Sequence, residues 1–168
     1  MIYLIGYMGV GKTTIAKQLS KQLQLPFLDT DFEIEKKEKK SVSDIFKDEG
    51  ELHFRMLETE FLNQIKNNAI IACGGGMPMH NDNMSIMNKK GISIYLKTSA
   101  NFLTNRLKNK KQHRPLITNI PDEELENYIK KELQNRSPSY HLAHHTIIVD
   151  NKSIDELLRE VNSLISTL

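Results

Sequence analysis

The chain has 168 residues, of which 39% are hydrophobic and 26% charged, and its formal net charge is +2. This length predicts a single domain over residues 1–168, and the near-neutral charge gives no reason to expect nucleic acid or a membrane as a partner. The apolar runs are strand-sized, so we expect neither a membrane span nor a signal peptide. One cysteine, Cys73, excludes an internal disulfide and a cysteine-based zinc site, and it favours a cytoplasmic location.

The first apolar run, residues 2–5, predicts a strand that leads into a glycine-rich stretch. Residues 6–13 match the pattern G-x-x-x-x-G-K-[ST] in full, and the apolar spacing of the next residues predicts a helix from about Lys12. Glycines in such a loop let backbone N–H groups approach phosphates closely, and the helix start adds further N–H groups. We therefore predict a nucleoside triphosphate site formed by Gly9, Val10, Gly11, Lys12, Thr13 and Thr14, with Lys12 on the β- and γ-phosphates and the Thr13 hydroxyl on Mg²⁺.

Two aspartates, Asp29 and Asp31, are expected to close the second strand. Ligands of open α/β sheets bind at the carboxyl ends of the strands, so both carboxylates should lie near the glycine-rich loop. One could hold Mg²⁺ through water, and the other could orient or deprotonate an attacking hydroxyl. Turn capping by aspartate is the alternative interpretation.

A polar, helix-prone segment follows, and Ser43 is expected to cap the helix that begins after it. A second helix should contain Leu52 and Met56, and it places Arg55 and Glu58 one turn apart. Glu58 could hold the Arg55 guanidinium so that it binds a carboxylate with two nitrogens. A surface ion pair without function is the alternative.

The next strand stops at Gly74, Gly75 and Gly76, where backbone N–H groups have room to meet a polar ligand. A further strand (residues 91–98) and a helix (99–108) lead to a basic loop that contains Arg114. This loop is predicted to be either a solvated connection or a lid over the transferring phosphates, in which Arg114 stabilises charge. Arg136, after a helix over residues 122–135, is a second guanidinium that could reach the substrate.

The last elements are a strand at residues 145–150 and a helix that begins at a capping box formed by Ser153 and Glu156. We expect His141, His144 and His145 to be boundary residues rather than metal ligands, and Cys73 to be a buried apolar side chain. Strands and helices alternate along the chain, which predicts an α/β fold with parallel strands.

Taken together, these motifs resemble the shikimate kinases over nearly the whole chain. The segments GYMGVGKTT, DTD, SVSDIF, FRMLE, GGG, RPLI and NRSPSY occur in the order typical of that family. The resemblance implies a three-layer α/β/α P-loop kinase fold with a five-stranded parallel sheet. It also implies a helical substrate-binding segment at about residues 31–60 and a lid at about 108–120.

The resemblance further implies phosphorylation of the 3-hydroxyl of shikimate by ATP, with Mg²⁺, on the route to chorismate and the aromatic amino acids. Catalysis would involve Lys12, Asp31 and Arg114, the metal would be held by Thr13 and Asp29, and Arg106 would stack on adenine. Shikimate would meet Asp31, Phe46, Phe54, Arg55, Gly74, Gly75, Gly76 and Arg136. A monomer is expected. A gluconate or nucleotide kinase of the same fold, or a non-catalytic nucleotide-binding module, are the alternatives.

Overall fold

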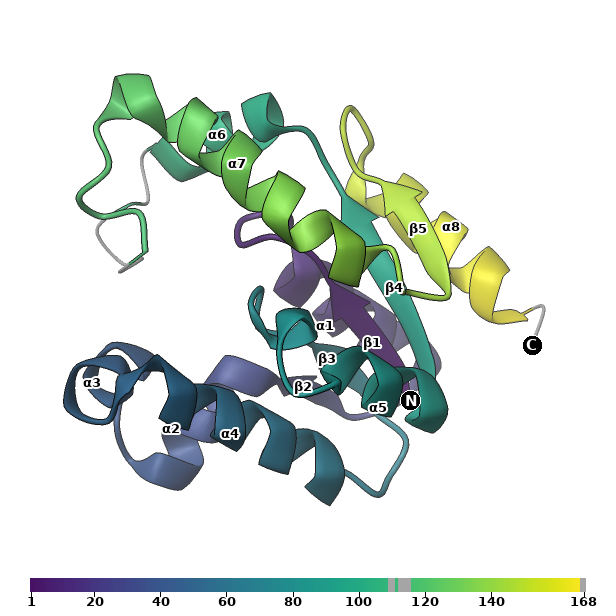
Figure 1. The fold of residues 1–168 in the computed structure, drawn as a ribbon. Helices are drawn as coiled ribbons and strands as arrows, with labels where there is room; N and C mark the ends of the chain where they lie inside the picture. The colour runs from purple at the N-terminus through teal and green to yellow at the C-terminus, as the bar shows by residue number, and fades with distance from the viewer. Residues whose placement is uncertain (109–110, 112–115, 167–168) are drawn as a thin grey trace.

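A computed structural model describes residues 1–108, 111 and 116–166 of the chain (Figure 1). Its centre is a sheet of five parallel strands in the order β2-β3-β1-β4-β5, which confirms the predicted parallel sheet. The strands are β1 (Ile2–Ile5), β2 (Phe27–Asp29), β3 (Ile70–Ala72), β4 (Ile92–Lys97) and β5 (His145–Ile148). Because β1 lies in the middle, the glycine-rich loop after it emerges at the centre of the sheet's carboxyl edge.

Helices cover both faces of the sheet. They are α1 (Lys12–Leu23), α2 (Thr30–Glu38), α3 (Val42–Asp48), α4 (Gly50–Gln64), α5 (Asn83–Lys90), α6 (Ala100–Leu107), α7 (Asp122–Tyr140) and α8 (Ile154–Ser166), with a 3₁₀ turn η1 (Met77–Met79). Among the described residues, no helix is long and apolar enough to cross a membrane.

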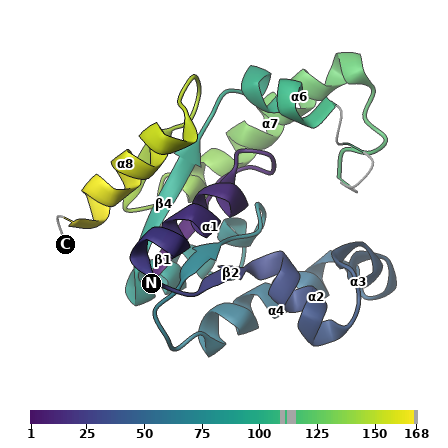
Figure 2. The ribbon, with the colours of Figure 1, turned by 180° about the vertical axis from the view of Figure 1, so that it is seen from behind.

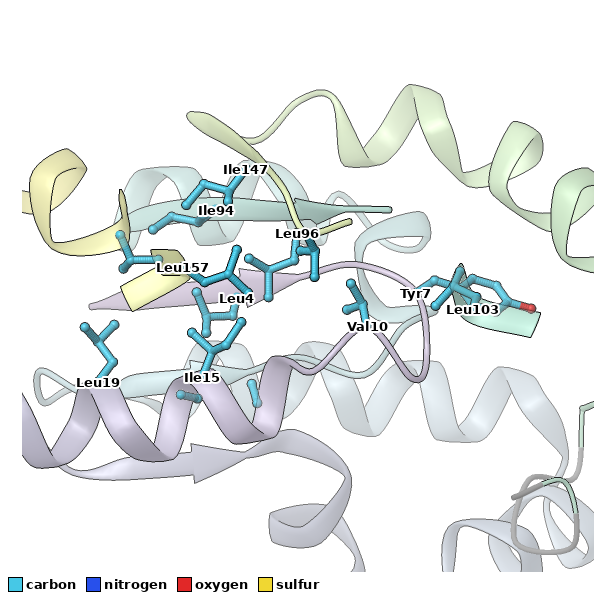
Figure 3. Packing of buried hydrophobic residues seen from close by; sticks show 14 of the residues in the cluster. Leu4, Tyr7, Val10, Ile15, Leu19, Ile94, Leu96, Leu103, Ile147 and Leu157 are labelled. Atoms are coloured by element: carbon cyan, nitrogen blue, oxygen red, sulfur yellow. The ribbon is translucent and has the colours of Figure 1, made fainter. Parts of the chain in front are cut away.

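Alternate residues of the central strand point to two separate hydrophobic clusters, as expected for a sheet buried on both faces. Ile2 and Leu4 pack with α1, α6 and α8, and Figure 3 shows part of this cluster. Seen from behind, α1 and α8 lie in front of the strands (Figure 2). Tyr3 and Ile5 pack on the opposite face with α5 and the end of α7.

Helices α2, α3 and α4 form a separate group beside the sheet (Figure 1). A third cluster holds them together through Ile34, Ile45, Phe54 and Leu57. The cap of α3 is not Ser43, as the sequence suggested, but Ser41, whose hydroxyl accepts a hydrogen bond from the Asp44 N–H. Both serines suit a cap, and the turn after α2 places the extended, non-helical residue at Ser41.

The two last helices differ in how well the sequence predicted them. Helix α7 continues to Tyr140, five residues beyond the predicted end, although Pro138 lies within it. A proline in the last turn removes only one backbone hydrogen bond, and the buried Tyr140 side chain fixes the helix end. Helix α8 begins as predicted: Ser153 N–H donates to Glu156 Oε2 (2.8 Å) and Glu156 N–H donates to Ser153 Oγ (3.3 Å).

Candidate active site

Two cavities open at the carboxyl edge of the sheet. The first has a volume of about 360 Å³ and is lined by part of the P-loop (residues 6–13) and by Asp29, Arg106 and Leu107, among others. The second has a volume of about 280 Å³ and is lined by residues of α2, α3 and α4, by Gly76, Leu116 and Arg136. Four residues line both cavities: Met8, Asp31, Gly74 and Gly75.

The P-loop adopts a backbone that only glycine tolerates at several positions. Gly6 has φ +142°, and a methyl group there would lie 2.7 Å from the Leu96 carbonyl oxygen. Lys12, the first residue of α1, donates hydrogen bonds to the carbonyls of Gly6 (2.8 Å) and Tyr7 (3.1 Å). These two bonds hold the lysine ammonium next to the loop, where it could form an ion pair with a bound phosphate.

Thr13 and Asp29 lie side by side in the first cavity. The Thr13 hydroxyl donates to Asp29 Oδ2 at 2.9 Å. A hydroxyl and one carboxylate, with phosphate oxygens and waters, form the kind of ligand set that Mg²⁺ takes in kinases. No group of three or more His, Cys, Asp or Glu side chains that could hold a metal occurs within the described ranges.

Asp31 does not end β2, as predicted, but lies in the first turn of α2. The strand stops at Asp29, the last residue paired with β3, and the helix begins at once. The side chain still reaches the cavity, since a methyl group on Gly74 would lie 2.6 Å from Asp31 Oδ1. Burial, and secondarily the charge of Asp29, raises the pKa of Asp31, while Lys12 opposes the shift.

Arg55 of α4 is held by two glutamates. Its Nη1 donates to Glu58 Oε2 (2.9 Å), and its Nε and Nη2 donate to Glu51 Oε1 (3.1 and 2.6 Å). The predicted contact with Glu58 is thus present. Glu58 is fully buried, its Oε1 has no hydrogen-bond partner within the described part of the chain, and burial raises its pKa to about 7 against the opposing effect of Arg55.

Glycines make room for these charged side chains. A methyl group on Gly76 would lie 2.5 Å from Arg55 Nη2, and one on Gly74 would lie 2.8 Å from Glu58 Oε1. Close packing therefore favours glycine at positions 74 and 76, whereas a methyl group on Gly75 would make only an ordinary contact of 3.4 Å with Met8 N. The aromatic wall lies beside the triple glycine: the rings of Phe46 and Phe54 are 5.0 Å apart, and the Arg55 guanidinium lies 5.7 and 5.5 Å from their centroids.

Arg136 enters the second cavity from α7, opposite Arg55. The Nε and Nη2 of Arg136 donate hydrogen bonds to Glu132 Oε2 (3.1 and 2.5 Å). The guanidinium carbon of Arg136 lies 4.9 Å from the centre of the Tyr7 ring. Tyr140 donates to the Gly75 carbonyl at 2.6 Å, which ties the end of α7 to the triple glycine. The two arginines thus line one cavity from different sides.

Arg106 lines the first cavity from α6, with its guanidinium 5.3 Å from the centre of the Phe102 ring. Arg114, predicted to act from the lid, lies outside the described residues. The structure therefore locates every other predicted site residue but not this one.

Several residues of the site were missed by sequence reasoning. Three of them, Met8, Glu35 and Leu116, line the cavities. The Thr30 hydroxyl accepts a hydrogen bond from the Gly74 N–H at 2.7 Å, and Tyr140 binds the Gly75 carbonyl. The side chains that contact the arginines are Glu51 at Arg55, and Tyr7 and Glu132 at Arg136. Glu51 and Glu132 each precede their arginine by four residues on a helix, so this spacing could have indicated them. The others depend on contacts distant in sequence.

This fold, with a P-loop at the carboxyl edge of the sheet and a second cavity beside it, defines a P-loop kinase. The family model described as shikimate kinase matches residues 8–166. A shikimate kinase of Flavobacterium johnsoniae is 45% identical, and one of Flavobacterium psychrophilum is 42% identical, each over 98% of both chains. The chain belongs to the shikimate kinase family, whose members use ATP.

Solved structures agree with this assignment. The shikimate kinase of Bacteroides thetaiotaomicron matches with a TM-score of 0.89 and 34% identity, covering 98% of this chain and 97% of its own. The enzyme of Acinetobacter baumannii, in complex with shikimate, matches with a TM-score of 0.88 and 34% identity, covering 99% and 92%. A gluconokinase of Sinorhizobium meliloti, at 13% identity, covers 96% and 89% with a TM-score of 0.57 and shares the fold alone.

Proposed function

We propose that the chain transfers the γ-phosphoryl group of ATP to the 3-hydroxyl of shikimate, with ATP in the first cavity and shikimate in the second. The observation that carries this proposal is that the two cavities meet at Met8, Asp31, Gly74 and Gly75. A hydroxyl bound in one cavity and a phosphate bound in the other would approach each other there. Because phosphoryl transfer depends mainly on positioning and charge, this shared boundary is the natural place for it.

The acceptor cavity suits a small acid that carries hydroxyl groups. Arg55 and Arg136 offer N–H donors from two sides, a combination that matches a carboxylate. Asp31 offers a carboxylate at the junction, where it would orient the attacking hydroxyl and accept its proton. Gly74, Gly75 and Gly76 would border the ring, with Phe46 and Phe54 on its apolar side.

The nucleotide cavity suits Mg·ATP. The backbone of Gly9, Val10 and Gly11, with Thr14, would surround the phosphates, and Lys12 would move from the Gly6 and Tyr7 carbonyls to the β- and γ-phosphates. Thr13 and Asp29 would hold Mg²⁺, which neutralises phosphate charge when bound. Arg106 would lie against adenine, and Arg114 would stabilise charge on the transferring group.

A monomer in the cytoplasm is the accompanying proposal. The location is supported by the supply of ATP in that compartment. Gel filtration with light scattering would measure the mass in solution.

The test is an assay of ADP release with shikimate, gluconate or AMP as acceptor, with Mg²⁺ varied. Rapid turnover is expected with shikimate and at most background rates with the other two. Lys12→Ala is expected to abolish transfer while leaving the thermal unfolding transition in place. Near wild-type turnover by folded Lys12→Ala protein, or equal rates with gluconate, would contradict the proposal.

A further inference from the structure

Tyr7 and Val10 are the P-loop residues whose side chains lie in the hydrophobic core rather than in the first cavity, and Tyr7 is the one that also meets an arginine of the second cavity. Its backbone carbonyl accepts hydrogen bonds from Lys12 Nζ (3.1 Å) and from the Val10 N–H (3.3 Å), so its main chain belongs to the loop. Its ring is buried, with 1% of its surface exposed, and it packs in the cluster that contains Leu103 of α6 (Figure 3). The main chain of Tyr7 is thus part of the P-loop, while its ring is part of the core.

The ring of Tyr7 supports Arg136 directly. The guanidinium carbon lies 4.9 Å from the ring centroid, within the range of a cation–π interaction. Burial raises the pKa of the Tyr7 phenol, so the ring stays neutral. Glu132 holds the Nε side of the guanidinium, and a methyl group on Gly75 would lie 3.5 Å from Nη1. The ring and the glutamate thus both hold the Arg136 guanidinium in place.

The hydroxyl of Tyr7 does not explain why a tyrosine is present. It is buried and has no hydrogen-bond partner among the residues that the structure describes. A buried hydroxyl without a partner costs stability, so the useful part of this side chain is its aromatic face. That face is turned to Arg136.

We infer that Tyr7 is a positioning residue that holds Arg136 over the acceptor cavity and links this arginine to the P-loop. This inference rests on the proposed role of Arg136 in binding the shikimate carboxylate. An arginine that is already oriented loses less conformational freedom when it binds a carboxylate, so removal of the ring should weaken acceptor binding. The ring does not line the first cavity, so ATP binding should be affected little.

The experiment compares Tyr7→Phe, which keeps the ring, with Tyr7→Leu, which removes it. We expect Tyr7→Leu to raise the KM for shikimate by about 5-fold to 30-fold, with kcat and the KM for ATP changed by less than about twofold. Tyr7→Phe should restore wild-type values. The methyl ester of shikimate, which lacks the negative charge, should show no such loss of kcat/KM in Tyr7→Leu, and neither should shikimate in an Arg136→Met background.

Phe102→Leu is the matched control, because Phe102 lies under Arg106 as Tyr7 lies under Arg136, but on the nucleotide side. It should leave the KM for shikimate unchanged. If Tyr7→Leu does not fold, as judged by thermal unfolding, phenylalanine with a fully fluorinated ring at position 7 keeps the shape and removes the attraction to a cation. It should then reproduce the rise in KM.

Three results would overturn the inference. They are equal losses for shikimate and its ester, an equal rise in the KM for ATP, or a defect in Tyr7→Phe as large as that of Tyr7→Leu. The role of Arg136 is tested separately by Arg136→Met alone. If that variant binds shikimate normally, the proposed function of Arg136 is wrong; if it fails and Tyr7→Leu does not, only the inference about Tyr7 is wrong.

Discussion

At the scale of single residues, the proposed function divides the chemistry between the two aspartates near the P-loop. Asp29 contacts Thr13 in the nucleotide cavity, whereas Asp31 lies at the boundary that both cavities share. Asp31→Asn keeps the shape but removes the proton acceptor, so turnover with shikimate should fall by about 10²–10⁴ with little change in Mg·ATP affinity. Asp29→Asn should instead raise the Mg²⁺ concentration needed for half-maximal rate. An assay in which magnesium and shikimate are each varied measures both effects. If Asp31→Asn changed only the magnesium requirement and Asp29→Asn lowered turnover, the two roles would be reversed.

The guanidinium of Arg55 has a geometry that lysine cannot reproduce. Three of its N–H groups are fixed by Glu51 and Glu58, which leaves others to meet a carboxylate. Arg55→Lys should therefore weaken shikimate binding by roughly 2–4 kcal/mol, while ATP binding stays close to wild type. Calorimetric titration of each ligand measures this difference. Equal weakening of both ligands would indicate that Arg55 has a structural role only.

At the scale of elements, the cap of α3 offers a direct comparison of two serines. Ser41 accepts a hydrogen bond from the Asp44 N–H, whereas Ser43 lies inside the helix. Ser41→Ala should reduce the free energy of unfolding by about 1 kcal/mol, and Ser43→Ala should change it much less. Urea unfolding of both variants checks this, and a larger loss in Ser43→Ala would contradict the assignment of the cap.

Local patterns predicted the elements better than their ends. The alternation of apolar runs and helical spacings along the chain predicted the parallel sheet. The glycine-rich motif predicted the P-loop, because it is encoded within a few consecutive residues. Asp31 was misplaced because the sequence does not show that β2 stops where its pairing with β3 ends. Tyr7 was missed for a similar reason: its contact with Arg136 joins residues more than a hundred positions apart.

At the scale of the whole molecule, the second cavity, where we propose that the acceptor binds, is assembled from two halves of the structure. Arg55 comes from the group of helices beside the sheet and Arg136 from α7 across it (Figure 1). Thr30 ties the first half to the triple glycine and Tyr140 ties the second. The junction thereby brings acidic side chains together in a buried place, where Asp31 and Glu58 both have raised pKa values.

The buried carboxyl of Glu58 should make the stability of the protein depend on pH in a defined direction. Glu58 has a pKa of about 7, above its ordinary 4.5, so the folded state binds more protons than the unfolded state between these values. The free energy of unfolding contributed by Glu58 should therefore fall as pH rises from about 5 to 7 and then level off. Glu58→Gln cannot ionise, so its stability relative to the wild type should increase across that range.

Urea unfolding of both proteins at pH 5, 6, 7 and 8 measures this difference. Glu60→Gln is the control on the same helix, because Glu60 is exposed, pairs with Lys37 and has a lowered pKa, which places its titration below this range. It should show no comparable trend. A difference between Glu58→Gln and wild type that stays constant or shrinks as pH rises would mean that the Glu58 carboxylate is not disfavoured by burial. The charge of Arg55, 2.9 Å away, would then outweigh the loss of solvent.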